Sequence, residues 1–216
     1  MLTSLTSLRL DGSSLTEGGL TGSLPSEFGQ LPLVAMDLWG GQLSGEIPSE
    51  LGNLSSMTHL SIVDNFFSGT VPVELSMMDS LAHLDLQGSA LVSLPTEIGL
   101  LTKMAHLNLA RSQFASMPSE VGLLTKMTLL DLSLNQFVSV PTEVGLLTAL
   151  EYLYLSYNPL SSLPSELGLL SNLYTVYLHN TSLIGTMPQN FCAEEVDLVF
   201  DCSESLCGCD CECFRS

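Results

Sequence analysis

Apolar and polar positions repeat along much of the chain with a period of 23 residues. The repeat is clearest from residue 127 to residue 149, MTLLDLSLNQFVSVPTEVGLLTA. Leu130 and Leu132 alternate there with outward positions, which predicts a short strand with one buried face. Phe137 and Val140 follow the turn and predict a second apolar column on the returning limb. The leading apolar residues of the repeats are Leu5, Leu33, Met57, Leu81, Met104, Met127, Leu150 and Leu173.

This unit has the form L-x-x-L-x-L-x-x-N-x-L, which is typical of leucine-rich repeats when it recurs every ~20 to 30 residues. Eight copies predict an α/β repeat fold, a leucine-rich-repeat solenoid of about eight coils over residues 1–191. We expect the strands to form a parallel concave sheet. Short 3-10 or helical turns are expected on the convex side.

The turn after each strand carries a polar position, occupied by Asn135 in the clearest repeat. Its amide can bond backbone groups that the turn leaves unpaired, so stacked copies predict a hydrogen-bonded ladder. Most of the residues at this position can bond through a side chain, whereas the glycine cannot. They are Ser13, Gly41, Asn65, Ser89, Ser112, Asn158 and Thr181.

The convex turn is predicted from Pro141 to Gly145, with Pro at its first position, an acid in its first turn and Gly at its end. The acid recurs two residues after Pro, as Glu27, Glu50, Glu74, Glu97, Glu120, Glu143 and Glu166. We interpret this column as a solvated face in which each Glu favours a local helix start. The alternative is a calcium-binding rail, although single carboxylates on successive coils rarely supply six to eight oxygens to one ion.

Some repeats carry a glycine before the proline, and these are one residue longer between the turn and the proline. They are TGSLP (Gly22), SGEIP (Gly45), SGTVP (Gly69) and IGTMP (Gly185). This predicts two kinds of coil with different return limbs, and an insertion at residues 15–19 is expected to bulge.

The L-x-G-x-I-P form resembles the plant-type extracellular leucine-rich repeat of receptor-like kinase ectodomains and polygalacturonase-inhibiting proteins, over residues 1–191. The resemblance implies extracellular recognition by the concave face.

All six cysteines lie in residues 192–216, which we predict to be a disulfide-stapled carboxyl-terminal cap. They are Cys192, Cys202, Cys207, Cys209, Cys211 and Cys213. Their pairing is open. The alternative is a thiolate metal cluster, but C-x-C-x-C-x-C lacks the paired C-x-x-C of zinc sites. The tail resembles those of secreted or cell-surface leucine-rich-repeat proteins of diatoms and related algae.

Composition limits the class of partner. The net charge is −18, from 23 acids and 5 bases, so binding to nucleic acid through its phosphates is disfavoured. Polar residues interrupt every apolar stretch, so no membrane span is predicted.

The first residues are already in repeat register without a signal peptide, which suggests a fragment of a longer chain. Two sequons, at Asn53 and Asn180, are consistent with glycosylation on a secretory route to the cell surface or outside.

The outward strand positions carry the candidate ligand-binding residues. All five tyrosines fall on or beside the last two predicted strands, near His179: Tyr152, Tyr154, Tyr157, Tyr174 and Tyr177. We interpret them as an exposed aromatic binding patch. The alternative is packing against the tail.

Three further histidines, His59, His83 and His106, share one column on consecutive strands. Either a metal bound with Asp85, a pH-responsive ligand face or an ordinary polar ladder would explain them. Trp39 faces outward near Asp37 and completes the candidate set.

Known catalytic motifs are missing from the sequence. We therefore expect no enzyme, no catalytic residue, no cofactor and no metal site. The leading hypothesis is an extracellular recognition module, part of a larger receptor-like protein, that binds a protein, peptide or glycan on its concave face. A structural cell-wall or matrix protein that binds polysaccharide, mineral or ice is the second hypothesis. An intracellular scaffold is the third.

Overall fold

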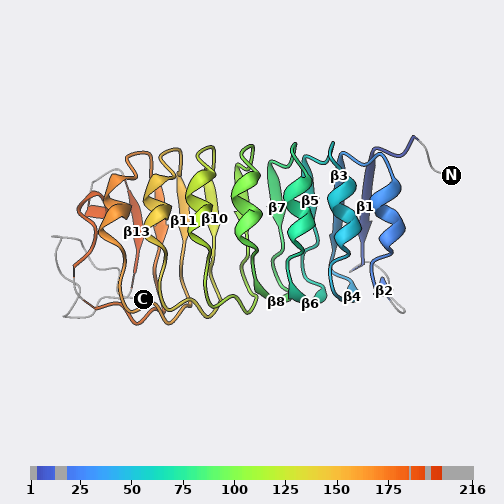
Figure 1. Ribbon diagram of the computed structural model, residues 1–216. Helices are drawn as coiled ribbons and strands as arrows, with labels where there is room; N and C mark the ends of the chain where they lie inside the picture. Colours follow the sequence, from blue (N-terminus) through green and yellow to red (C-terminus); the bar gives the residue numbers. More distant parts are fainter. Residues whose placement is uncertain (1–3, 13–18, 185, 193–195, 201–216) are drawn as a thin grey trace.

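The chain winds into a solenoid of stacked coils, as the repeat pattern predicts (Figure 1). The computed structural model describes residues 4–12, 19–184, 186–192 and 196–200. Strands line one side of the solenoid and short 3-10 helices line the other. The fold is a leucine-rich-repeat solenoid. We call its two sides the sheet face and the helical face.

A parallel sheet of nine strands forms the sheet face. Its order follows the sequence: β1 (Ser7–Asp11), β3 (Ala35–Trp39), β5 (His59–Ser61), β7 (His83–Asp85), β9 (His106–Asn108), β10 (Leu129–Asp131), β11 (Tyr152–Tyr154), β12 (Thr175–Tyr177) and β13 (Asp197–Val199). The first eight strands come from the eight predicted repeats. The ninth, β13, comes from the segment that the sequence assigns to the cap and pairs with β12.

The predicted inner positions form the core. Leu130 and Leu132 are fully buried, and so are Phe137 and Leu153. Phe67, Phe114 and Phe137 make the second apolar column that the return limbs contribute. One continuous cluster therefore runs through the solenoid, because each coil buries its apolar residues against its neighbours.

The helical face consists of single turns of 3-10 helix, drawn as coiled ribbons in Figure 1. They are η1 (Ser26–Gln30), η2 (Ser49–Asn53), η3 (Val73–Met77), η4 (Thr96–Leu100), η5 (Ser119–Leu123), η6 (Thr142–Leu146), η7 (Ser165–Leu169) and η8 (Gln189–Cys192). The proline precedes each of η1 to η7 as its N-cap residue, one residue earlier than the sequence predicts.

The glycine of these turns has a packing role that the sequence analysis missed. Gly145 lies inside η6, not at its end, and a Cβ there would come within 2.5 Å of the carbonyl oxygen of Glu166 in the next coil. Glycine is therefore required by the close approach of successive coils, not by a helix stop.

Two kinds of coil are present, as predicted. The return limbs of the first four coils form short strands in a second sheet: β2 (Thr21–Gly22), β4 (Gln42–Gly45), β6 (Phe66–Thr70) and β8 (Ala90–Ser93). The first three of these limbs contain the glycine. Gly22, Gly45 and Gly69 each have φ between 83° and 91°, a conformation that favours glycine. The return limb of β8 lacks this glycine but still joins the sheet.

The asparagine ladder is confirmed where asparagine is present. Asn65, Asn135 and Asn158 are buried, and each donates to backbone carbonyls of its own and the preceding coil. Serine does not replace asparagine here, because the buried Oγ atoms of Ser89 and Ser112 have no hydrogen-bond partner. The ladder is therefore interrupted in the middle of the solenoid.

Several predictions concern residues outside the described ranges. These are the cysteines from Cys202 to Cys213, the turn position of Ser13, Gly185 and most of the insertion at residues 15–19. Cys192 ends η8, and its side chain is outside the described part of the structure. The disulfide cap stays a prediction. None of the helices in the described ranges is long and apolar enough to cross a membrane.

Candidate ligand-binding site on the sheet face

The strand register places the outward residues in columns, as the sequence predicts. The first column is Ser7, Ala35, His59, His83, His106, Leu129, Tyr152 and Thr175. The second is Arg9, Asp37, Ser61, Asp85, Asn108, Asp131, Tyr154 and Tyr177. Residues that are 23 or more positions apart in the sequence thereby become neighbours on adjacent strands.

A groove of about 490 Å³ lies over the amino-terminal strands. Its lining includes Asp37, His59, His83, Asp85 and His106. Arg9 lines it too. The Arg9 Nε lies 3.0 Å from the Asp37 carboxylate, and the arginine side chain is 78% exposed, so this pair contributes little to stability.

The three histidines of the first column stack against one another. The ring centroids of His59 and His83 are 4.1 Å apart and nearly parallel, and those of His83 and His106 are 4.3 Å apart and perpendicular. Burial lowers the pKa of His83, and the neighbouring His106 and His59 lower it further. Burial and the two neighbouring rings thus favour the neutral form of the central His83 ring.

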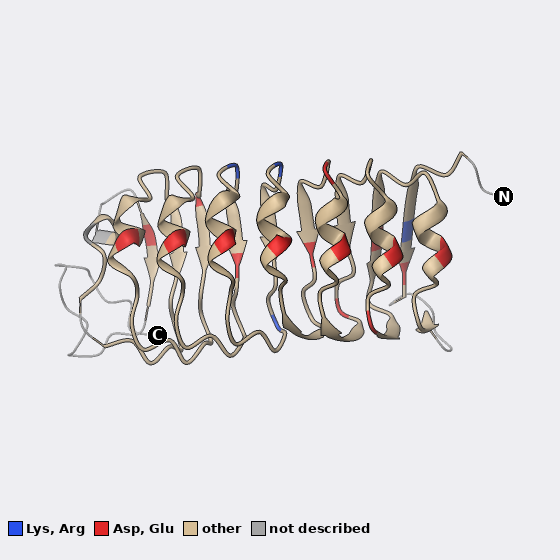
Figure 2. Ribbon diagram, in the orientation of Figure 1, with Lys and Arg blue, Asp and Glu red and all other residues tan. Residues whose placement is uncertain are grey.

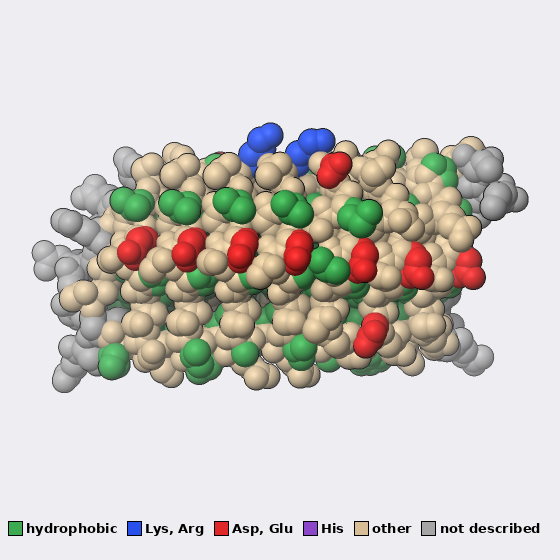
Figure 3. Space-filling model, in the orientation of Figure 1, with side chains coloured by type: hydrophobic (Ala, Val, Ile, Leu, Met, Phe, Trp, Pro, Cys, Tyr) green, Lys and Arg blue, Asp and Glu red, His purple; other side chains and the backbone are tan. Residues whose placement is uncertain are grey.

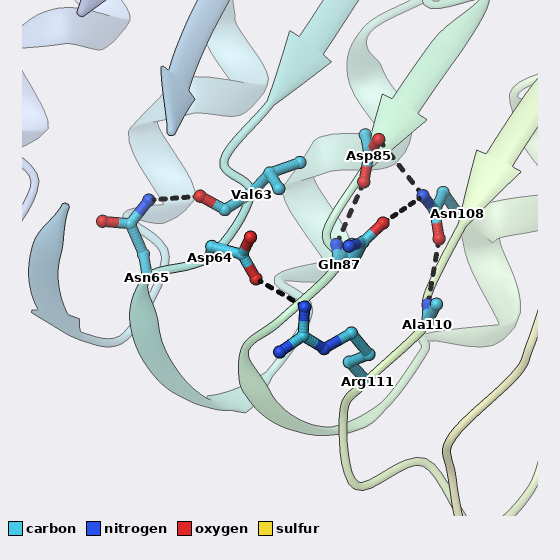
Figure 4. A network of polar contacts seen from close by, with 8 residues as sticks. All are labelled: Val63, Asp64, Asn65, Asp85, Gln87, Asn108, Ala110 and Arg111. Atoms are coloured by element: carbon cyan, nitrogen blue, oxygen red, sulfur yellow. Dashed lines mark hydrogen bonds and ion pairs between the residues drawn. The ribbon is translucent and has the colours of Figure 1, made fainter. Parts of the chain in front are cut away.

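Asp85 belongs to a polar network over β7 and β9 (Figure 4). Its Oδ1 accepts from the backbone N–H of Gln87, and its Oδ2 accepts from Asn108 Nδ2. Asn108 Nδ2 also donates to Gln87 Oε1, while its Oδ1 accepts from the N–H of Ala110. Burial raises the pKa of Asp85, and the hydrogen bonds that Asp85 accepts from Gln87 and Asn108 oppose that effect. Asp85 thus stabilises the end of β7 through Gln87 and joins it to the end of β9 through Asn108. Short polar side chains commonly bond nearby backbone groups in this way.

No group of three or more His, Cys, Asp or Glu in the described ranges is arranged to hold a metal ion. Both oxygens of Asp85 already accept hydrogen bonds, and the histidines contact one another through their rings. In the described structure this column is a row of imidazole rings in contact, and its role in ligand binding stays a prediction.

The tyrosines form two separate contacts on the carboxyl-terminal strands. Tyr154 and Tyr177 face each other across β11 and β12, with ring centroids 5.0 Å apart and planes at 41°. Tyr152 and Tyr174 make an edge contact at 6.1 Å. Tyr174 is 60% exposed, whereas Tyr152, Tyr154 and Tyr177 are half-buried. The aromatic surface is therefore accessible and supported by neighbouring rings.

A second pocket, of about 250 Å³, lies beside the first tyrosine pair. We call it the tyrosine pocket. It is lined by Asp131, Ser133, Leu134, Tyr154, Ser156, Tyr157, Tyr177 and His179. The His179 ring contacts Tyr157 at 5.0 Å and Tyr177 at 6.2 Å, and its Nδ1 lies 2.9 Å from Ser156 Oγ. Three of the five tyrosines and His179 thus line one small site.

Two residues of the tyrosine pocket have left-handed backbone conformations. Leu134 has φ 55° and Tyr157 has φ 56°. The equivalent residues of five other coils also have positive φ, between 49° and 71°: Gly40, Asp64, Gly88, Arg111 and Asn180. The conformation therefore belongs to the turn of the repeat, and for a bulky side chain it costs about 1 to 2 kcal/mol.

Asp131, Leu134 and Ser156 were not among the candidate residues predicted from sequence, although they line the tyrosine pocket. The signal for Asp131 was present, because its column places it next to Tyr154. Asp131 Oδ1 accepts from both the N–H and the hydroxyl of Ser133, at 2.9 and 2.6 Å. Burial raises its pKa.

The other predicted residues lie apart from these two sites. Trp39 is 41% exposed at the end of β3 and lines neither the groove nor the tyrosine pocket. Asn53 is exposed at the end of η2, on the helical face. Asn180 is exposed just beyond β12 with φ 54°. The sequons are therefore both at the surface, and only the second is next to the aromatic residues.

The helical face carries two regular rows. The glutamates of η1 to η7 form an acidic row across the solenoid (Figure 2). Beside it runs a row of exposed apolar side chains (Figure 3). These are Met77, Leu100, Leu123, Leu146 and Leu169, each between 53% and 63% exposed. The sequence analysis missed this apolar row.

Comparison with known proteins supports the fold. A family model described as Leucine Rich Repeat matches residues 149–170. A comparison with curated protein sequences gives no match. Among solved structures, a leucine-rich-repeat protein of Leptospira interrogans is 26% identical, with a TM-score of 0.72 over 84% of this chain and 47% of that one.

Plant receptor ectodomains are also similar to this chain. The ectodomain of the Arabidopsis thaliana receptor kinase GASSHO1/SCHENGEN3, in complex with CASPARIAN STRIP INTEGRITY FACTOR 2, is 31% identical, with a TM-score of 0.67 over 91% of this chain and 26% of that one. The Arabidopsis receptor kinase HAESA, in complex with the peptide hormone IDA and the co-receptor SERK1, is 27% identical, with a TM-score of 0.69 over 93% and 39%. This chain spans less than half the length of each of these structures.

Proposed function

We propose that this leucine-rich-repeat solenoid is a non-enzymatic recognition module, and that the tyrosines of β11 and β12 are the main contact for a protein, peptide or glycan ligand. The observation that carries the proposal is the gathering of all five tyrosines on two adjacent strands and their flanking residues. Four of these five make ring contacts with another tyrosine. The residues that line the tyrosine pocket include the fifth, Tyr157.

Physical chemistry favours a ligand over a structural explanation for this patch. The inner strand positions, such as Leu153 and Val176, already fill the core, so the coil does not need the outward tyrosines for burial. Tyrosine gives a ligand rigid, partly apolar contact area at low conformational cost. Binding hot spots are enriched in such residues.

The similarity to receptor ectodomains supports a peptide or protein as the ligand. Two of the similar plant structures are complexes with a named peptide or factor. We propose by analogy that the present chain is likewise the recognition part of a larger extracellular or cell-surface protein. A thiol titration of protein purified from culture medium tests the location: six reactive cysteines without bound metal contradict it.

The binding proposal is tested by selecting ligands from a displayed peptide library on the native protein and measuring affinity by calorimetry. Tyr154→Ala and Tyr177→Ala are each expected to weaken binding by about 1 kcal/mol or more. Glu97→Gln on the helical face is the control and is expected to leave affinity unaltered. Unchanged affinity in both tyrosine variants moves the site to the groove over the amino-terminal strands, which His59, His83 and His106 line. A large drop in melting temperature instead shows that the tyrosines are structural.

A structural role in a wall or matrix is the second candidate function, and the regular rows of the helical face favour it. A repetitive partner would contact the row of leucines and glutamates at equal intervals. Leu123→Ser and Glu120→Gln are then expected to weaken adsorption to isolated wall material, while Tyr154→Ala leaves adsorption unchanged. Adsorption that depends on Tyr154 and not on Leu123 removes this candidate.

A further inference from the structure

We propose that the tyrosine pocket binds a single organic cation, namely the ammonium or guanidinium group of a lysine or arginine side chain in the ligand, with Asp131 as its counter-charge. This inference rests on the proposed recognition function and names the group that its central site takes. It concerns the pocket alone and not the rest of the sheet face.

The arrangement of the rings is the first support. Three ring contacts join four side chains around the pocket: Tyr154 with Tyr177, Tyr177 with His179, and His179 with Tyr157. Their planes meet at 41°, 55° and 86°, so the rings do not cover one another face to face. The faces of aromatic rings carry negative potential and attract cations within about 6 Å of the centroid.

The charge of the pocket is the second support. Asp131 is the carboxylate among the lining residues, and Lys and Arg are absent from them. Its Oδ1 is held by the N–H and hydroxyl of Ser133, so its position is fixed before a ligand arrives. Arg9 and Arg111 pair with Asp37 and Asp64 elsewhere. With 23 acids against 5 bases, the protein attracts cationic ligands in general, and the rings select where one is held.

Size is the third support. The pocket volume of about 250 Å³ is below the ~300 to 1,000 Å³ typical of pockets for drug-sized molecules, so it suits one side chain.

The test uses the whole chain labelled with 13C at its tyrosine rings, followed by NMR. Two probes are compared: the peptide acetyl-Gly-Gly-Lys-Gly-Gly-amide and its analogue with norleucine in place of lysine. We expect the lysine peptide to shift the signals of Tyr154, Tyr157 and Tyr177. Tyr152 and Tyr174 form the separate edge pair and serve as internal controls whose signals stay in place. Equal shifts with the norleucine peptide overturn the proposal in favour of an apolar site.

Two carboxylate variants separate the pocket from the general negative charge. Asp131→Asn is expected to weaken binding of the lysine peptide by about two- to fivefold, the effect of ~0.5 to 1 kcal/mol. Asp85→Asn is the matched control, because Asp85 occupies the same column two strands away and also binds the N–H two residues on. Equal weakening by both variants indicates attraction by the overall charge and contradicts a specific site.

Two ring variants test the aromatic contribution. Tyr154→Phe keeps the ring face and is expected to bind the lysine peptide within about twofold of the wild type, whereas Tyr154→Leu is expected to weaken it about two- to fivefold. Wild-type affinity in Tyr154→Leu overturns the cation-binding inference. The proposed function then still stands if the selected peptides depend on Tyr154 and Tyr177. If those peptides do not depend on either tyrosine, the proposed function fails as well.

Discussion

Asn135 donates its side-chain amide to the carbonyl oxygen of Leu109, 26 residues earlier in the preceding coil, at 2.8 Å. Its Oδ1 accepts from the N–H of Phe114 in that same coil, at 3.0 Å. One buried side chain thus satisfies a donor and an acceptor of its neighbour while also bonding its own turn. A buried backbone group without such a partner costs about 1 to 3 kcal/mol, so the ladder joins one coil to the next.

Ser112→Asn is therefore expected to stabilise the protein. The serine hydroxyl is buried without a partner, and the coils on the carboxyl-terminal side show that asparagine fits this turn. The added hydrogen bonds are expected to raise the free energy of unfolding by about 0.5 to 1.5 kcal/mol, measured by urea denaturation. Asn135→Ala is the converse control and is expected to lower it by about 1 to 3 kcal/mol. A destabilised Ser112→Asn variant contradicts this account of the ladder.

Leu132→Ala is expected to lower the free energy of unfolding by about 2 to 5 kcal/mol, since truncating a fully buried leucine leaves a cavity. Leu132 is 0% exposed, whereas Leu134, two residues on, is 44% exposed. Leu134→Ala is the matched control and is expected to stay within about 0.5 kcal/mol of the wild type. Chemical denaturation of both variants checks the strand register, and a larger loss in Leu134→Ala would show that register to be wrong.

Tyr157→Asn is expected to keep or slightly raise stability. The residue has φ 56°, which asparagine tolerates better than tyrosine, and its side chain is 46% exposed. If Tyr157 were structural, its removal would lower the free energy of unfolding. A fall of more than about 1 kcal/mol in thermal or urea unfolding therefore assigns Tyr157 to the cap. Affinity for the selected ligand is expected to fall in the same variant.

Stability is expected to decline on mild acidification because of His83. The pKa of His83 is lowered in the folded state from its usual 6.5, so the unfolded chain takes up protons first as the pH falls. The contribution is fully present above pH 6.5 and is lost as the pH falls through the folded pKa. His83→Gln is expected to reduce the slope of unfolding free energy between pH 7.5 and 5.5. An unchanged slope would mean that His83 titrates like an exposed histidine.

The sequence by itself determined the period, the register of the eight repeat strands and the inward or outward direction of the residues in them. A fixed repeat stacks one coil on the next, and alternation along a strand assigns each side chain to one face. The pattern alone therefore places His59, His83 and His106 in one column and Tyr154 beside Tyr177, and the strand register agrees. The apolar columns of Leu132 and Phe137 followed from the same pattern.

Only the tertiary structure decided which side chains are buried between the coils and which contacts join one coil to the next. Leu100 and Leu101 are adjacent and chemically identical, yet the first is 62% exposed and the second 1%, because the direction of a single helical turn fixes which one meets the core. The same holds for Ser112, whose hydroxyl is too short to reach the preceding coil. Tyr157 meets His179 of the next coil, a ring contact that the pattern within one repeat does not give. Such contacts depend on backbone angles and distances between residues far apart in sequence, which composition and periodicity do not encode.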